Sequence, residues 1–215
     1  MAKRIIFWIL GALLIIIAAG GLLYKPLIQP WHLRYGATDA EVQAALPGDA
    51  ILTGQVTQAT RAIDVHAPAA QAWPWLVQLG QGRGGLYSYD WLENLVGCDI
   101  HTLSVIVPDL QNLKLGDTIK IGNFAALPYY RVALIEPQRA LVLRVVDAKT
   151  GLDGSSTWGF YLDEHSPTLT RLIIRHRDVT AVNSTDKVIN AIFEPISFVM
   201  EQKMLRGLRD HAEGD

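Results

Sequence analysis

The sequence predicts an α+β domain in which an antiparallel β-sheet wraps around a long C-terminal helix. Two observations lead to this prediction. Short β-rich segments at hairpin spacing follow one another from residue 113 to residue 176, and an apolar helical repeat follows them. A sheet has to bury one of its faces. Wrapping it around the last helix does so and leaves an internal cavity between the two.

The N-terminus carries a long apolar segment. Residues 5–24, from Ile5 to Tyr24, contain no charge, and a helix of this length spans about 30 Å, the thickness of a bilayer core. We therefore expect a single-pass transmembrane anchor over residues 1–25. A cleaved signal peptide and a buried core helix are the alternatives. Lys3 and Arg4, set against Lys25, weakly favour a cytoplasmic N-terminus and an extracytoplasmic domain.

Composition excludes several classes of protein. Without Lys3 and Arg4, 17 of the 19 basic residues remain against 21 acidic ones, a formal charge of −4. This balance argues against a nucleic-acid surface. The single cysteine, Cys98, rules out a disulfide within the chain. The six histidines lack metal-ligand spacing, so we expect neither a metal nor a cofactor.

Residues 26–59 are expected to be a linker with one short helix. Pro26 and Pro30 interrupt any continuation of the anchor helix. Thr38 and Glu41 match a capping box, which predicts a brief helix at residues 41–46. Three aromatic side chains of this linker are expected either at the membrane surface or packed against the domain: Trp31, His32 and Tyr35.

The domain proper, residues 60–212, is expected to begin with a strand at residues 60–65 and a helix that Pro68 opens. Pro74 should kink this helix. The run from Gly80 to Gly85 matches G-x-G-x-x-G, but a helix precedes it, so it predicts a tight turn instead of a dinucleotide site. Ser88 is the expected N-cap of a second helix that ends near residue 95.

The second half of the domain is expected to be a β-meander followed by the final helix. A Gly-Asp turn signal at residues 116–117 predicts a hairpin within residues 113–121. Further strands are expected at residues 129–135, 140–146, 156–162 and 168–176. Pro195 marks either a kink in the final helix or its start.

Several segments resemble the START-like superfamily, also called Bet v 1-like or SRPBCC, and within it the polyketide cyclase/dehydrase-type branch. The matching segments are residues 63–68, 73–76, 87–94 with His101, 115–117, 170–172, 194–195 and 199–201. The resemblance covers residues 60–212. It implies a helix-grip fold that encloses a small apolar ligand. Members include lipid carriers, hormone receptors and ring cyclases, so the fold does not select one function.

Asp90, Glu93 and His101 are the candidate acid–base residues. A carboxylate that reaches His101 in a buried site would form a proton-transfer pair. In the alternative interpretation, Asp90 and Glu93 cap the helix and are solvated at the surface. No sequence around Ser88, Cys98 or Ser104 resembles a nucleophile motif.

The walls of the expected cavity are aromatic and apolar side chains from both halves of the domain. They are Trp75, Tyr87, Trp91, Trp158, Phe160, Phe198 and Met200, with Tyr89, Asp90, Glu93, His101 and Arg144 as polar groups that orient the ligand. An inward Arg144 would need an acidic partner, and an outward Arg144 would be a surface residue.

These features predict a membrane-anchored domain that binds a small hydrophobic molecule, a lipid or a polyketide-like compound, in an internal cavity. A cyclase- or dehydratase-type enzyme that uses Asp90, Glu93 or His101 is the first alternative. A cell-envelope module that binds a partner protein and has a filled cavity is the second.

Overall fold

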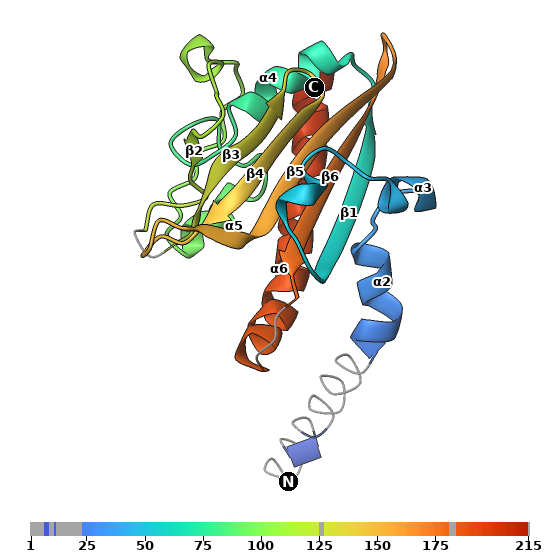
Figure 1. Ribbon diagram of the computed structural model, residues 1–215, viewed down its shortest axis with the longest axis vertical. Coiled ribbons are helices and arrows are strands. Elements are labelled where there is room, and N and C mark those ends of the chain that lie inside the picture. Colours follow the sequence, from blue (N-terminus) through green and yellow to red (C-terminus); the bar gives the residue numbers. More distant parts are fainter. Residues whose placement is uncertain (1–6, 9–10, 12–22, 125–126, 181–183, 215) are drawn as a thin grey trace.

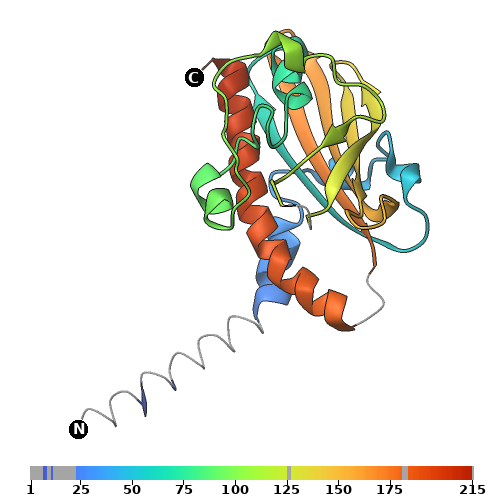
Figure 2. The same cartoon turned by 90° about the vertical axis from the view of Figure 1, so that its left-hand side faces the viewer.

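The computed structural model describes residues 7–8, 11, 23–124, 127–180 and 184–214. Within these residues, a six-stranded antiparallel sheet packs against the long C-terminal helix α6 (Ser184–Glu213). Figure 1 looks onto the sheet with α6 behind it, and Figure 2 shows the helix and the sheet side by side. The predicted α+β fold with a long C-terminal helix is confirmed.

The sheet joins the first strand of the domain to the last. Its order is β1 (Val56–Val65), β6 (Leu169–Val179), β5 (Asp153–Ser166), β4 (Ala140–Val146), β3 (Tyr129–Glu136) and β2 (Thr118–Ile119). Every neighbouring pair is antiparallel, and β3 to β6 form the predicted meander. The hairpin predicted within residues 113–121 is wrong. Asp117 closes a turn onto the Lys114 amide, and β2 pairs with β3 instead.

Side chains alternate between the two faces of the sheet, as the period of a strand requires. The inner face buries Leu143, Phe160 and Ile174 in one cluster with Leu205 and Leu208 of α6. The outer face carries a second, smaller cluster, which contains Val142, Tyr161 and Ile173. The sheet therefore has an apolar layer on each side, and α6 covers the inner one.

The helices largely follow their predicted signals. Pro68 occupies the N-cap of α4 (Ala69–Val77), and Pro74 lies inside that helix. The second helix, α5 (Asp90–Leu95), has Tyr89 at its N-cap instead of Ser88, whose hydroxyl donates to the Met200 carbonyl oxygen at 3.0 Å. Pro195 lies within α6 and does not mark its start.

The segment expected to be a linker is folded against the domain, with residues 37–51 on the outer face of the sheet and residues 29–32 against α6. It contains η1 (Tyr24–Ile28), α2 (Gln29–His32), α3 (Asp39–Gln43) and η2 (Asp49–Ile51). The capping box of Thr38 and Glu41 is present at the start of α3. Ala37, Leu46 and Ile51 pack against the outer apolar cluster. This segment thereby shields apolar sheet surface from water.

The predicted membrane anchor, residues 1–25, lies outside the described residues, apart from positions 7, 8, 11 and 23–25. Among the described residues, no helix combines the length and the apolar character needed to cross a bilayer. The anchor therefore stays a prediction.

Candidate functional site

The inner face of the sheet carries an aromatic row. Trp158 of β5 lies with its ring centroid 4.8 Å from Phe160, 5.5 Å from Tyr130 of β3 and 5.1 Å from His176 of β6. Trp158 and Phe160 are 6% and 0% exposed. The buried indole nitrogen of Trp158 has no hydrogen-bond partner among the described residues. Trp158 and Phe160, two of the residues predicted to line the cavity, therefore lie side by side in the buried interior.

A second aromatic group lies at the C-terminal end of α6. Trp75 of α4 stacks on His211 with 4.5 Å between ring centroids and contacts Tyr87 edge-on at 6.0 Å. Tyr87 is buried, which raises the pKa of its hydroxyl to about 12. Its backbone approaches Gly207 so closely that a Cβ there would lie 2.4 Å from the Tyr87 carbonyl oxygen. These contacts fix the chain before α5 onto α6.

The other end of the interior is closed by Phe198 and the N-terminal segment. The Phe198 ring lies within 5.2 to 5.7 Å of Trp31, His32 and Tyr35, measured between ring centroids. His32 is 1% exposed, so this group packs against the domain, although Trp31 remains 53% exposed. Met200, a further predicted wall residue, is half-buried next to Ser88.

A buried ionic cluster lies between β1, β6 and α6, and sequence patterns did not identify it. Glu201 contacts Arg61 at 2.8 Å and His176 at 2.7 Å. Burial by itself would raise the pKa of Glu201, but the charges of His176 and Arg61 outweigh it and lower this pKa to about 2. The sequence does contain a signal, because Glu201 interrupts the apolar stripe of Phe198, Leu205 and Leu208 on α6.

A related polar group joins the N-terminal segment to α6. Glu194 accepts hydrogen bonds from the Gln29 amide at 2.8 and 3.0 Å and lies 3.0 Å from His32 Nε2. The Tyr24 hydroxyl lies 2.6 Å from the same His32 nitrogen. Burial lowers the pKa of His32, against the opposing effect of Glu194. These contacts hold α2 against α6.

The structure gives Asp90 and His101 separate partners. The Asp90 carboxylate accepts from the Thr102 amide at 2.7 Å and from its hydroxyl at 2.6 Å. His101 has a side chain that is 77% exposed and lies 3.1 Å from Asp99. The expected pairing of His101 with a buried carboxylate is therefore not formed. Asp90 fastens the loop after α5, and a catalytic role for either residue stays a prediction.

Glu93 is the candidate carboxyl that lies in a protected environment. Its side chain is 8% exposed, and its Oε2 atom is buried without a hydrogen-bond partner among the described residues. Burial first, and the charge of Asp90 second, raise its pKa to about 7. Burial and the nearby Glu93 also raise the pKa of the Cys98 thiol. A carboxyl of this kind exchanges a proton near neutral pH.

Two predicted ligand contacts point away from the interior. Trp91 is 68% exposed on the outer side of α5, because Glu93 is the buried position of this short helix. Arg144 lies on the outer face of the sheet, in phase with Ala140 and Val142. It contacts Asp153 at 3.5 Å there. Tyr89 is half-buried at the N-cap of α5.

The glycine-rich loop is the tight turn that the sequence predicts. Gly80 and Gly85 form an isolated antiparallel bridge. Arg83 donates to the carbonyl oxygens of Val77, Leu79 and Leu110 at 2.9 to 3.2 Å, so its guanidinium holds the turn together. This loop positions α5 beside the interior and offers no phosphate cradle.

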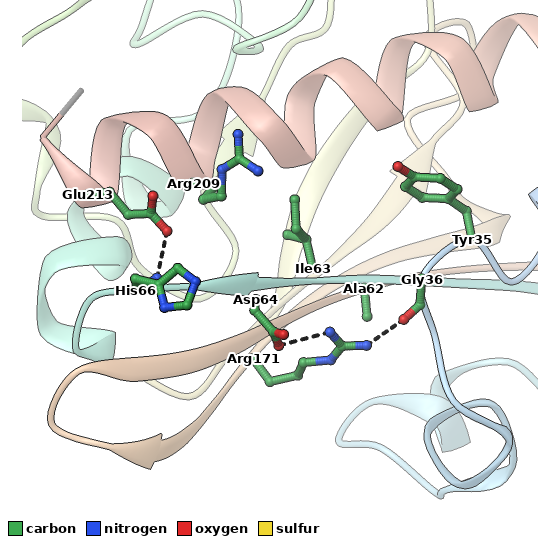
Figure 3. A pocket seen from close by; sticks show the side chains of 9 residues that line it. All are labelled: Tyr35, Gly36, Ala62, Ile63, Asp64, His66, Arg171, Arg209 and Glu213. Atoms are coloured by element: carbon green, nitrogen blue, oxygen red, sulfur yellow. Dashed lines mark hydrogen bonds and ion pairs between the residues drawn. The ribbon is translucent and has the colours of Figure 1, made fainter.

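Two open surface hollows of about 410 Å³ each stand out among the described residues. One lies between β1 and the end of α6, where Arg171 bridges Asp64 and the Gly36 carbonyl, and the His66 amide donates to Glu213 (Figure 3). The other includes Arg144. Both hollows are open to the surface and lie outside the sheet–helix interior, so neither corresponds to the predicted internal cavity.

No protein-family model matches the chain, and no curated protein matches it. Similar solved structures include the Zhui aromatase/cyclase from Streptomyces sp. R1128, at 14% identity and a TM-score of 0.44 over 74% of this chain and 94% of that one. Ara h 8.0201 is 8% identical, with a TM-score of 0.44 over 75% of this chain and 100% of that one. MLL2253 from Mesorhizobium loti is 15% identical, with a TM-score of 0.40 over 72% of this chain and 97% of that one. These are likenesses of the fold, and the family resemblance drawn from the sequence stays a prediction.

Proposed function

We propose that the protein binds a small hydrophobic molecule, a lipid or a polyketide-like compound with a polar acceptor atom, between the sheet and α6. The observation that carries this proposal is the buried indole N–H of Trp158, which has no partner among the described residues. A buried donor costs free energy until an acceptor pairs with it. An acceptor atom of a ligand in the aromatic row would supply that pairing.

The surroundings of Trp158 suit an apolar ligand. Phe160 and Tyr130 offer aromatic faces beside it, and burial of apolar ligand surface contributes about 25 cal/mol per Å². Because these side chains are packed against one another, the ligand has to displace them as it binds.

The test is native mass spectrometry of the full-length chain, released from nanodiscs made from membranes of the expressing cells. We expect a co-purifying lipophile. Trp158→Phe keeps the aromatic ring but removes the donor, and it should weaken retention about tenfold, the equivalent of one hydrogen bond. Trp73→Phe, on the half-buried side of α4, is the matched control. Equal retention by Trp158→Phe would contradict the role of the Trp158 donor. A consistently empty protein would contradict ligand binding and favour a partner-binding module with a filled interior.

Acid–base catalysis of the cyclase or dehydratase type is the second candidate function, and Glu93 favours it. A carboxyl with a pKa of about 7 is suited to donate and accept protons at neutral pH. Prolonged incubation of the recovered lipophile with the protein should then change its mass by the loss of water, and Glu93→Gln should abolish this change. An unchanged lipophile after incubation with the unmodified protein would exclude this function.

We also propose that residues 5–24 anchor the chain in a membrane, with the domain on the extracytoplasmic side. The length of the uncharged segment supports the anchor, and the basic residues before it support the orientation. Resistance to carbonate extraction tests the anchor. Protease digestion of spheroplasts tests the orientation, since an extracytoplasmic domain should be cleaved while the cells remain intact.

A further inference from the structure

We propose that exposed apolar side chains of η1 and α2, of α5 and its C-cap, and of residues 193–199 in α6 form a membrane-contact face that lies against an anionic lipid bilayer. This inference rests on the anchoring part of the proposed function and does not depend on an internal ligand. The face consists of Leu27, Ile28, Trp31, Trp91, Leu95, Val96, Phe193, Ile196 and Val199.

Helix α6 supplies the central row of this face. Phe193, Ile196 and Val199 are 59%, 49% and 47% exposed and follow one another at three-residue spacing, so they share one side of the helix. Phe198 and Glu201 are buried on the opposite side, against the sheet and α2. Residues 193–201 of α6 therefore present an exposed apolar row on the side opposite to the one that packs against the sheet and α2.

Helices α5 and α2 extend the row on either side. Trp91 and Leu95 of α5 are 68% and 76% exposed, and Leu27 beside α2 is 65% exposed. Ser88 holds the start of the α5 region at Met200, and Gln29 holds α2 at Glu194. Figures 1 and 2 both place α2, α5 and the first half of α6 towards the same end of the molecule.

The position of the N-terminal segment identifies the occupant. The uncharged residues 5–24 lead directly into Leu27 and α2, so an anchor in the bilayer brings this end of the domain to the lipid surface. Trp and Phe side chains favour the interface between lipid and water. A contiguous apolar surface of this kind marks a site of interaction in a small domain.

The charges beside the apolar row suit anionic headgroups. Lys203 follows Ile196 by seven residues, and Arg206 follows Val199 by seven, which places each basic residue two turns further along the same side of α6. Basic side chains beside an apolar surface bind anionic headgroups while the apolar side chains enter the lipid. This pattern favours the lipid surface over a protein partner.

The test uses the full-length chain, with Cys98→Ala, at one copy per nanodisc of equal parts phosphatidylcholine and phosphatidylglycerol. Single cysteines carry the environment-sensitive dye NBD in the variants Trp91→Cys and Ile196→Cys. The matched control is His165→Cys, near the end of β5, where the histidine side chain is 52% exposed. Figure 1 shows the β5–β6 turn, which follows directly, near the opposite end of the molecule. A fourth variant, Trp8→Cys, reports on the anchor itself.

We expect a blue shift of NBD emission, and quenching by spin-labelled lipid, at positions 8, 91 and 196 but not at 165. Ile196→Asp, a change at an exposed position, should abolish the quenching at position 91 while the melting temperature stays unchanged. Quenching at position 8 without quenching at 91 and 196 would overturn the contact face alone. Absence of quenching at position 8 would overturn the membrane anchor as well as the contact face. A blue shift at 91 and 196 without lipid quenching would show that the dye is shielded by protein and not by lipid, and it would overturn the proposal.

Discussion

Arg61 and Glu201 form a buried ion pair that joins the first strand of the sheet to the C-terminal helix. Arg61 Nη1 donates to Glu201 Oε1 at 2.8 Å, and the two side chains are 3% and 4% exposed. Arg61 Nε donates to the His32 carbonyl oxygen at 2.8 Å, and the guanidinium lies 5.3 Å from the centre of the Phe198 ring. This one pair therefore connects the sheet, α6 and α2.

Glu201→Gln should destabilise the protein by about 3 kcal/mol at pH 7, because it leaves the charge of Arg61 buried without a counter-charge. The pKa of Glu201 is lowered to about 2. The stabilisation is therefore complete above the ordinary glutamate range and is lost as the pH falls towards 2. Urea denaturation at several pH values measures this difference, which should shrink in acid. The double variant Arg61→Met/Glu201→Leu should recover stability. A Glu201→Gln variant that is as stable as the parent would contradict the prediction.

Glu93→Gln should stabilise the protein above neutral pH. Because burial raises the pKa of Glu93 to about 7, the folded state binds a proton that the unfolded state releases at lower pH. The contribution of Glu93 to the free energy of unfolding is complete in acid, and it falls by up to about 3 kcal/mol as the pH rises through about 7. Thermal denaturation at about pH 5 and about pH 8, one below and one above this pKa, should show the fall in the parent and not in Glu93→Gln. Asp163→Asn, at an exposed site, serves as control. A parallel pH dependence of the parent and Glu93→Gln would refute the assignment.

Asp90→Asn and His101→Ala should have different effects on stability. Asp90 accepts two hydrogen bonds from Thr102, and loss of bonds to a charged group costs about 1.5–3 kcal/mol. His101 is exposed, and its replacement should change stability by less than about 0.5 kcal/mol. Equilibrium denaturation of the two variants measures both values. A larger loss for His101→Ala than for Asp90→Asn would show that the loop after α5 is held differently.

Arg175→Met should release the segment between α3 and η2 from the outer face of the sheet. Arg175 is 2% exposed, and its guanidinium contacts Ala44 O and Asp49 Oδ2 at 2.8 Å and Glu41 O at 2.6 Å. Loss of these buried, charge-assisted bonds should accelerate amide hydrogen exchange in residues 41–49 while α6 keeps its protection. Arg139→Met is the control, since the Arg139 side chain is 73% exposed. Unchanged exchange in residues 41–49 would show that apolar contacts alone hold this segment.

Local signals in the sequence predicted most of the secondary structure. Helix periodicity, strand alternation and the capping box act between residues a few positions apart, so the sequence displays them directly. The error at residues 113–121 has the same origin. The Gly-Asp turn is real, but the partner of β2 is β3, which follows further along the chain.

Predictions that depended on which way a side chain points were less successful. Arg144 alternates with apolar residues, and only its pairing in the sheet assigns it to the outer face. Trp91 was expected to line the cavity, yet the short α5 turns Glu93 inward instead. Strand period and helix period define two or more faces but do not say which face meets the core.

By itself, the sequence determined the α+β order, the β-meander, the long final helix and the uncharged N-terminal segment, because each depends on neighbouring residues. The tertiary structure alone brought Arg61, His176 and Glu201 together from three elements. It also packed residues 37–51 onto the sheet and residues 29–32 onto α6, and it buried the Trp158 donor. These features arise from contacts between distant parts of the chain, and such contacts form only when the sheet closes on α6.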